Sequence, residues 1–138
     1  MIILDTNVIS EPMGGAPNPR VLAWFDAQTF ETLYLTSVTV GELRFGIATM
    51  PAGRRRDLLT ARMEKDTLPL FTGRILPYGL DATEEYARLM STARATGLAI
   101  APLDGMIAAT AAAAGFAVAT RDTSPFEAAG VPVIDPWQ

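Results

Sequence analysis

Short apolar runs alternate with longer helical patterns along this 138-residue chain, and no other feature limits its fold as strongly. Strand-like runs occupy residues 1–4, 34–36, 75–77, 116–120 and 131–134. Helical spacing of apolar residues begins near Thr6, Pro19, Ser37, Arg54, Asp81 and Asp104. This alternation is typical of βαβ units around a parallel sheet. The length and the lack of repeats predict one α/β domain over residues 1–138.

Residues that start or stop helices divide the helical segments. Asn18 followed by Pro19 predicts an N-cap and a first helical position. Gly97 and Gly115 predict two helix ends. The segment 51–53 separates two helices that we expect to form a hairpin. Val21, Leu22 and Phe25 are expected to share one face of the second helix, and the fourth helix is expected to bury Leu58, Leu59 and Met63.

The chain contains no cysteine and no histidine, which removes several kinds of chemistry. Without thiols there is no disulfide framework, no cysteine nucleophile and no cysteine-bound zinc. Without imidazoles, no mechanism that needs histidine as a base or as a metal ligand is available. Acid–base or metal chemistry in this chain must therefore use carboxylates.

The distribution of apolar residues predicts a cytoplasmic protein without a membrane segment. The first residues lack a basic stretch and reach a charge at Asp5, unlike a secretory signal. The least polar stretch, residues 105–120, lies between the charged residues Asp104 and Arg121. It is shorter than the roughly 18 apolar residues that a membrane helix needs.

Four acidic residues fall at the positions where an α/β sheet usually binds ligands. Asp5 and Asp122 follow predicted strands, whereas Glu42 and Asp104 lie in or near the first turns of predicted helices. Strands end and helices begin on the same edge of an open parallel sheet, so we expect the four carboxylates to converge. Oxygen ligands without histidine or cysteine select hard cations, Mg²⁺ or Mn²⁺.

Each of these acids also fits a purely structural role. Asp5 can cap the helix that follows it. Thr39 and Glu42 have the spacing of a capping box. Asp104 fits an N-cap position, and Asp122 fits an Asx turn. Capping and metal binding are compatible, so both interpretations stay open for all four residues.

Four motifs follow one another along the chain. Residues 1–10 read MIILDTNVIS, and Glu42-Leu43 comes next. Asp104 is followed by IAATA at 107–111, and residues 119–122 read ATRD. In this order the motifs resemble those of PIN-domain ribonucleases, most closely the VapC/FitB toxins of type II toxin–antitoxin modules. Residues 68–71, 73–77 and 136–137 are similar to the FitB-like branch in particular.

The resemblance implies a three-layer α/β/α PIN-like domain with a central parallel sheet of four to five strands. It also implies a Mg²⁺-dependent endoribonuclease, with Mn²⁺ as the other suitable ion. The metal ligands and catalytic residues would be Asp5, Glu42, Asp104 and Asp122. The polar neighbours that match the family motifs are expected to orient these carboxylates or a bound water: Thr6, Asn7 and Thr120.

One position departs from many VapC-type sequences. These carry asparagine where this chain has Asp122, and an aspartate where it has Pro125. Asp122 agrees with the FitB-like subgroup.

Two other classes of protein remain as alternatives. An Asp-nucleophile phosphatase or phosphotransferase needs a second aspartate where this chain has Asn7, and a later lysine for which Lys65 is badly placed. A catalytically inactive PIN-like binding module would be expected to lack one of the acids, and none is missing.

The resemblance further implies an RNA substrate, a homodimer, and an antitoxin that blocks the acidic groove while its other part binds operator DNA. The net charge of −4 suits such a substrate only where bound cations and nearby arginines reverse the local field. Arg121 is the best-placed residue to hold a phosphate or a partner carboxylate, and a surface ion pair is the alternative. The run Arg54–Arg56 is expected either to contact RNA or to be simply solvated.

The apolar content of 49% leaves some apolar surface for partners to cover. Leu43, Ile47, Met50 and Leu58 are the candidates for that surface. Trp24, Phe25 and Phe45 are expected in the core or at an interface rather than as platforms for base stacking.

Overall fold

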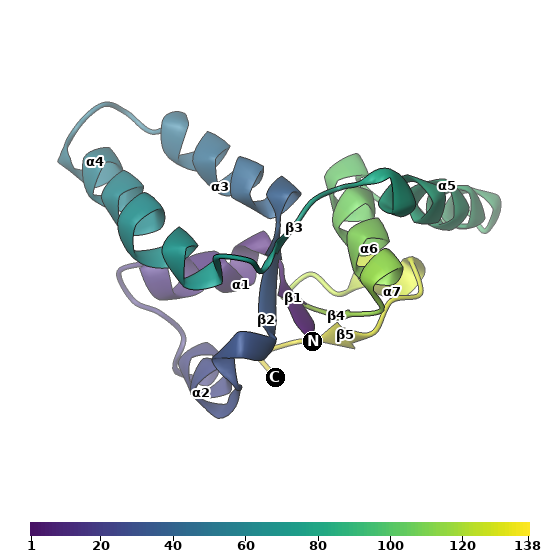
Figure 1. The fold of residues 1–138 in the computed structure, drawn as a ribbon, viewed down its shortest axis with the longest axis horizontal. Helices are drawn as coiled ribbons and strands as arrows, with labels where there is room; N and C mark the ends of the chain where they lie inside the picture. The colour runs from purple at the N-terminus through teal and green to yellow at the C-terminus, as the bar shows by residue number, and fades with distance from the viewer.

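The computed structural model describes residues 1–138 and contains a five-stranded parallel sheet (Figure 1). The strands are β1 (Ile2–Leu4), β2 (Leu33–Thr36), β3 (Ile75–Leu76), β4 (Ala117–Ala119) and β5 (Val133–Ile134). Their order is β3-β2-β1-β4-β5, and every neighbouring pair is parallel. The chain builds one half of the sheet outward from β1 and then returns to build the other half. The topological switch point therefore lies between β1 and β4, where ligands of α/β sheets bind.

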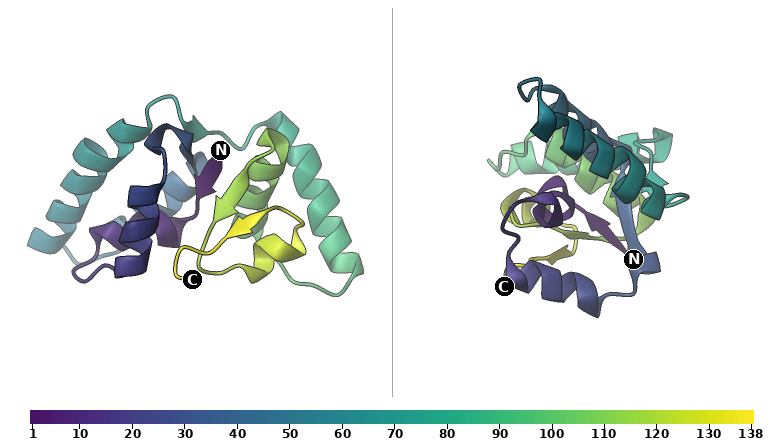
Figure 2. Two further views of the ribbon diagram at one scale, coloured as in Figure 1. Left: turned by 90° about the horizontal axis from the view of Figure 1, so that it is seen from below. Right: turned by 90° about the vertical axis from the view of Figure 1, so that its left-hand side faces the viewer.

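Seven α-helices connect these strands and lie on both sides of the sheet (Figure 2). They are α1 (Thr6–Ser10), α2 (Pro19–Ala27), α3 (Ser37–Ala48), α4 (Arg54–Ala61), α5 (Leu80–Ala95), α6 (Pro102–Ala114) and α7 (Ser124–Ala128). Short 3-10 turns cover Glu11–Met13, Phe30–Thr32 and Leu68–Phe71, and a π-helical segment covers Arg62–Thr67. The predicted three-layer α/β/α architecture and its central parallel sheet are confirmed.

The core is divided between the two faces of the sheet. Ile3 belongs to a cluster with residues of α5, α6 and α7, including Leu89, Ile107 and Phe126. Its neighbour Leu4 belongs to a second cluster that packs against α1, α3 and the segment 62–71. Successive residues of a strand point to opposite faces, so the run of apolar residues in β1 is required by burial on both sides.

Three predicted helix boundaries agree with the structure: the start of α2 at Asn18 and the helix ends at Gly97 and Gly115. The Asn18 side chain accepts a hydrogen bond of 2.8 Å from the Arg20 backbone N–H and so caps α2. Gly97 and Gly115 adopt positive φ angles of 76° and 71° and follow the last turns of α5 and α6. This left-handed conformation favours glycine.

One leucine assigned to a buried face is exposed instead. Leu58 is 49% exposed, so its predicted burial is wrong; Leu22, expected on one face with Val21 and Phe25, is 37% exposed. Helix α4 packs chiefly on α3 rather than on the sheet, which leaves one side of it uncovered. The π-helical turn after α4 shifts the register of the helix, and Met63 is buried as predicted. None of the helices is both long and apolar enough to span a bilayer.

Candidate functional site

Asp5 lies where β1 ends and α1 begins, and it is only 5% exposed. Its Oδ1 accepts a 2.8 Å hydrogen bond from the Thr6 backbone N–H, which confirms its role as a cap. Its Oδ2 accepts a 2.8 Å hydrogen bond from the hydroxyl of Thr120, across the β1–β4 junction. Burial raises the pKa of Asp5; the hydrogen bonds from Thr120 and Thr6 act against this rise, and the charge of Asp122 adds to it.

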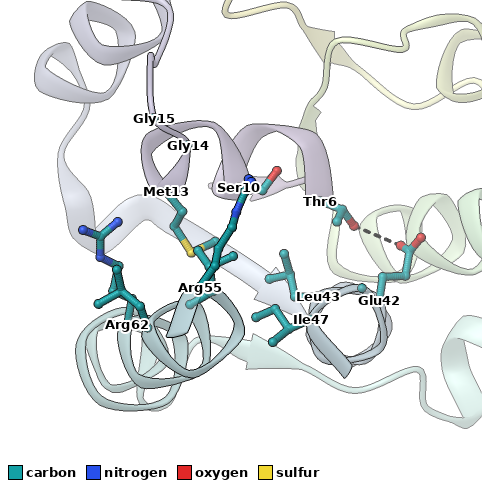
Figure 3. Close-up of a pocket in the computed structure, with 13 residues that line it drawn as sticks. Thr6, Ser10, Met13, Gly14, Gly15, Glu42, Leu43, Ile47, Arg55 and Arg62 are labelled. Carbon is teal, nitrogen blue, oxygen red and sulfur yellow. Dashed lines mark hydrogen bonds between the residues drawn. The ribbon is translucent and has the colours of Figure 1, made fainter. Parts of the chain in front are cut away.

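Glu42 lies in the second turn of α3, and the predicted capping box is wrong. The helix is capped instead by Thr36, whose hydroxyl accepts a 3.1 Å hydrogen bond from the Thr39 backbone N–H. Glu42 Oε1 accepts a 3.0 Å hydrogen bond from the hydroxyl of Thr6, as Figure 3 shows. Burial raises the pKa of Glu42, the Thr6 hydrogen bond opposes it, and the charge of Asp5 adds to it. The capping alternative for Glu42 therefore disappears.

Asp104 occupies the third position of α6, and its predicted role as an N-cap is also wrong. Pro102 takes the first helical position, so Ala101 is the N-cap and no side chain caps the helix. The half-buried Asp104 carboxylate makes no hydrogen bond within the chain. Burial first, and then the charges of Asp5, Glu42 and Asp122, raise the pKa of Asp104 to about 6.

Asp122 follows β4 and is exposed. The turn around it is made by Thr120, whose hydroxyl oxygen accepts a 3.1 Å hydrogen bond from the Asp122 backbone N–H. The predicted Asx turn is therefore wrong, since the Asp122 side chain plays no part in the turn. Its charge contributes to the raised pKa of both Asp5 and Asp104.

The supporting residues join the end of β1 to the end of β4. The buried Thr120 hydroxyl contacts Asp5, Asp122 and, at 3.5 Å, the amide nitrogen of Asn7. The amide oxygen of Asn7 accepts a 3.1 Å hydrogen bond from the Arg121 backbone N–H. Thr6, Asn7 and Thr120 thus contact the candidate acids or the loop that carries them.

The structure brings the four acids within electrostatic reach of one another, from four different elements. No three carboxylates lie close enough together to hold one metal ion as they stand. Hydroxyl groups hold Asp5 and Glu42, whereas the carboxylates of Asp104 and Asp122 make no hydrogen bond within the chain. The donor set consists of oxygen atoms alone, which fits Mg²⁺ or Mn²⁺. Burial raises the pKa of Asp104 most, and the neighbouring acids raise it further; a cation would offset this second contribution.

A groove of about 560 Å³ extends from Glu42 along the α3–α4 hairpin (Figure 3). Thr6 and Glu42 lie at its acidic end, and it also reaches the cations Arg55 and Arg62. The other lining residues are Ser10, Met13, Gly14, Gly15, Leu43, Gly46, Ile47, Leu58 and Leu59. The sequence pattern named Leu43, Ile47 and Leu58 as surface candidates, but Leu43 is only 7% exposed and belongs to the core, so that assignment is wrong. No sequence pattern indicated that Met13, Gly14 and Gly15 line the groove, because only the tertiary fold brings them to the hairpin.

The model of the PIN domain family matches residues 2–131 of this chain. The match covers nearly the whole chain and includes all four candidate acids. The chain therefore belongs to the PIN-domain family.

Relatives and solved structures agree with this assignment along the full length. The chain is 59% identical over 138 residues to VapC ribonuclease Y4jK of Sinorhizobium fredii, covering 100% of this chain and 99% of that protein. It is 50% identical over 137 residues to toxin FitB of Neisseria gonorrhoeae, covering 99% of each. It is similar to the structure of FitAB bound to an IR36 DNA fragment, with a TM-score of 0.96 and 49% identity over 100% of this chain and 96% of that one.

Proposed function

We infer that this chain is the toxin of a toxin–antitoxin module and that it hydrolyses RNA phosphodiester bonds with Mg²⁺, or alternatively Mn²⁺. The observation that carries this inference is that Asp5, Glu42 and Asp122 lie within electrostatic reach of Asp104 beside the switch point of the sheet. Burial first, and then these three charges, raise the pKa of Asp104 to about 6. The names of the relatives, a VapC ribonuclease and a FitB toxin, support the same activity.

The acids that would hold the ion are Asp5, Glu42, Asp104 and Asp122. A bound divalent ion lowers the pKa of a coordinated water and neutralises charge that develops on a phosphodiester. The chain contributes the placement of the acids. Thr6 holds Glu42 and Thr120 holds Asp5 through hydroxyl donors, which favour the ionised carboxylates that a cation requires.

The partners proposed for this chain are RNA, a second copy of the chain, and an antitoxin with a DNA-binding part. The groove along the α3–α4 hairpin suits an antitoxin segment because apolar residues form its lining beside Arg55 and Arg62. A complex of this kind is named in the FitAB structure bound to DNA. Light scattering of the free chain tests the homodimer, and a monomer at micromolar concentration would contradict it.

Cleavage of defined RNAs by the purified chain, followed by sequencing of the ends, tests the proposed activity. We expect cleavage with Mg²⁺, none with EDTA, and products that carry 5′-phosphates, as attack by metal-activated water requires. Ends with cyclic 2′,3′-phosphates would instead show attack by the ribose 2′-hydroxyl without a metal. The absence of any cleavage would favour the inactive binding module.

Substitution of single acids tests the site itself. Asp5→Asn and Asp104→Asn are expected to abolish RNA cleavage and growth inhibition while the chain still folds. Asp81→Asn is the matched control, because Asp81 lies in the first turn of another helix, α5. Undiminished toxicity of either site variant would refute the assignment.

The phosphatase alternative finds no support in the structure. Asn7, at the position where such an enzyme needs its second aspartate, bonds to the β4 end instead. Lys65 lies in the π-helical segment that follows α4 and not at the end of a strand.

A further inference from the structure

The C-terminal tail returns to the region of the acidic cluster after β5. The Trp137 backbone N–H donates a 2.9 Å hydrogen bond to Asp135 Oδ1. The Trp137 carbonyl accepts a 3.4 Å hydrogen bond from the guanidinium of Arg20 in α2. Its half-buried indole packs against the core cluster that contains Leu4. The tryptophan is thus held by contacts with both its own tail and other elements.

The guanidinium of Arg121 lies over this indole, 5.3 Å from the ring centroid. The Arg121 backbone is held as well, since its N–H donates to Asn7 Oδ1 at 3.1 Å. Arg121 is exposed and takes part in no ion pair, so the surface ion pair considered as an alternative is wrong. It is flanked in the chain by Thr120, which bonds to Asp5, and by Asp122.

An arginine that lies over an aromatic ring keeps its N–H donors available for another partner. The contact with an aromatic ring uses the face of the guanidinium, whereas its N–H donors point outward in the plane of the group. The Arg121 side chain donates no hydrogen bond within the chain. A rigid, solvent-facing fork of donors matches the two free oxygens of a phosphodiester.

We propose that Arg121, held in place by Trp137, binds a backbone phosphate of single-stranded RNA beside the acidic cluster, and that Trp137 is a positioning residue for it. This inference rests on the proposed RNA substrate. A chain of net charge −4 repels a polyanion, so a cation next to Asp122 supplies attraction where the substrate must approach. Arg121 covers a face of the indole, so that face of Trp137 is not available for stacking an RNA base. Trp137 is therefore proposed to position Arg121 and not to bind a base.

The test compares variants by KM and kcat on one cleaved RNA and by anisotropy of a labelled single-stranded oligonucleotide. Arg121→Gln is expected to raise KM about tenfold and to leave kcat within about twofold, because a charge-assisted contact is lost. The dependence of binding on salt concentration should fall by about 0.7 in logarithmic slope. Arg88→Gln makes the same change of charge on α5, where the guanidinium is paired with Glu85, and should change neither value.

Trp137 variants separate positioning from a general structural role. Trp137→Leu is expected to raise KM about threefold, whereas Trp137→Phe, which keeps an aromatic face, should restore nearly normal values. In the Arg121→Gln background, Trp137→Leu should have no further effect on KM, because the tryptophan acts through the arginine. Additive effects, or a loss in Trp137→Leu that is confined to thermal stability, would overturn the positioning role.

The outcomes distinguish this inference from the proposed function. Cleavage by the unaltered chain with an unchanged KM in Arg121→Gln would refute the phosphate contact and leave the ribonuclease proposal intact. Binding of RNA that depends on Arg121 without any cleavage would support the contact and refute the ribonuclease. A chain that neither binds nor cleaves RNA would overturn both.

Discussion

Replacing Asp104 with asparagine is expected to stabilise the fold in the absence of a metal ion. Burial and the charges of the other three acids raise the pKa of Asp104 from 3.8 to about 6. This rise corresponds to about 3 kcal/mol between the two protonation states. Solvent reaches the half-buried carboxylate, so screening reduces the figure to about 1.5 kcal/mol. The substitution also removes a negative charge that interacts favourably with the dipole of α6, which costs about 0.5 kcal/mol. The expected net increase in the free energy of unfolding is about 1 kcal/mol.

The stability gained by Asp104→Asn must increase as the pH rises. The pKa of Asp104 is higher in the folded chain than the ordinary value of 3.8, so the folded state binds more protons between pH 3.8 and about 6. The unaltered chain therefore loses stability as pH rises through this window. Asparagine does not titrate, so the advantage of Asp104→Asn should be absent near pH 3.8 and complete above about pH 7.

Urea denaturation in EDTA at pH 4 and pH 7.5 measures both effects. Asp81→Asn is the control, because it removes an acid from the first turn of α5 and should give no such gain. Added Mg²⁺ should stabilise the unaltered chain more than Asp104→Asn, since a ligand that binds only the folded state raises its stability. A variant that is less stable at pH 7.5, or equally stabilised at both pH values, would refute the electrostatic reasoning.

Substitutions at three further positions test contacts in the fold by chemical denaturation. Thr120→Val removes the donor to buried Asp5 and should lower the free energy of unfolding by about 2 kcal/mol, whereas Thr120→Ser keeps the hydroxyl and should lose less than half of that. Gly105→Ala would place a Cβ 2.7 Å from Met90 Sδ and should cost about 1 kcal/mol, and no loss would show that α5 and α6 pack less closely. Gly115→Ala should cost about 1–2 kcal/mol because its φ is 71°, and an unchanged stability would contradict the left-handed cap.

The structural alternatives for the acids could not be decided without the fold. The capping spacing of Thr39 and Glu42 is present in the sequence, yet Thr36 caps the helix and leaves Glu42 free to meet Thr6. Aspartate is a common N-cap residue, yet helix α6 begins at Pro102, two residues before Asp104. Local sequence limits where a helix can begin, and packing against the rest of the protein selects among the allowed starts.

The burial of apolar residues on helix surfaces also could not be predicted from the sequence. Leu58 has the spacing of a buried residue but lines the open groove. Phe45 is 71% exposed, so of the two places expected for it, core or interface, the core is excluded. A helical pattern shows which residues share a face and not which neighbour covers that face. Trp24 and Phe25 do pack against the core, and their rings meet edge to face with centroids 5.3 Å apart.

The sequence by itself determined the parallel α/β architecture and several helix boundaries, and it singled out the four candidate acids, because these depend on local periodicity, turn residues and the absence of histidine and cysteine. Only the tertiary structure decided that Thr120 holds Asp5, that Thr6 holds Glu42 and that Trp137 supports Arg121. These pairs are 36 or more residues apart, except for Arg121 and Trp137 in the last part of the chain. No local pattern records such contacts, since each depends on how the strands are ordered in the sheet and on where the tail returns.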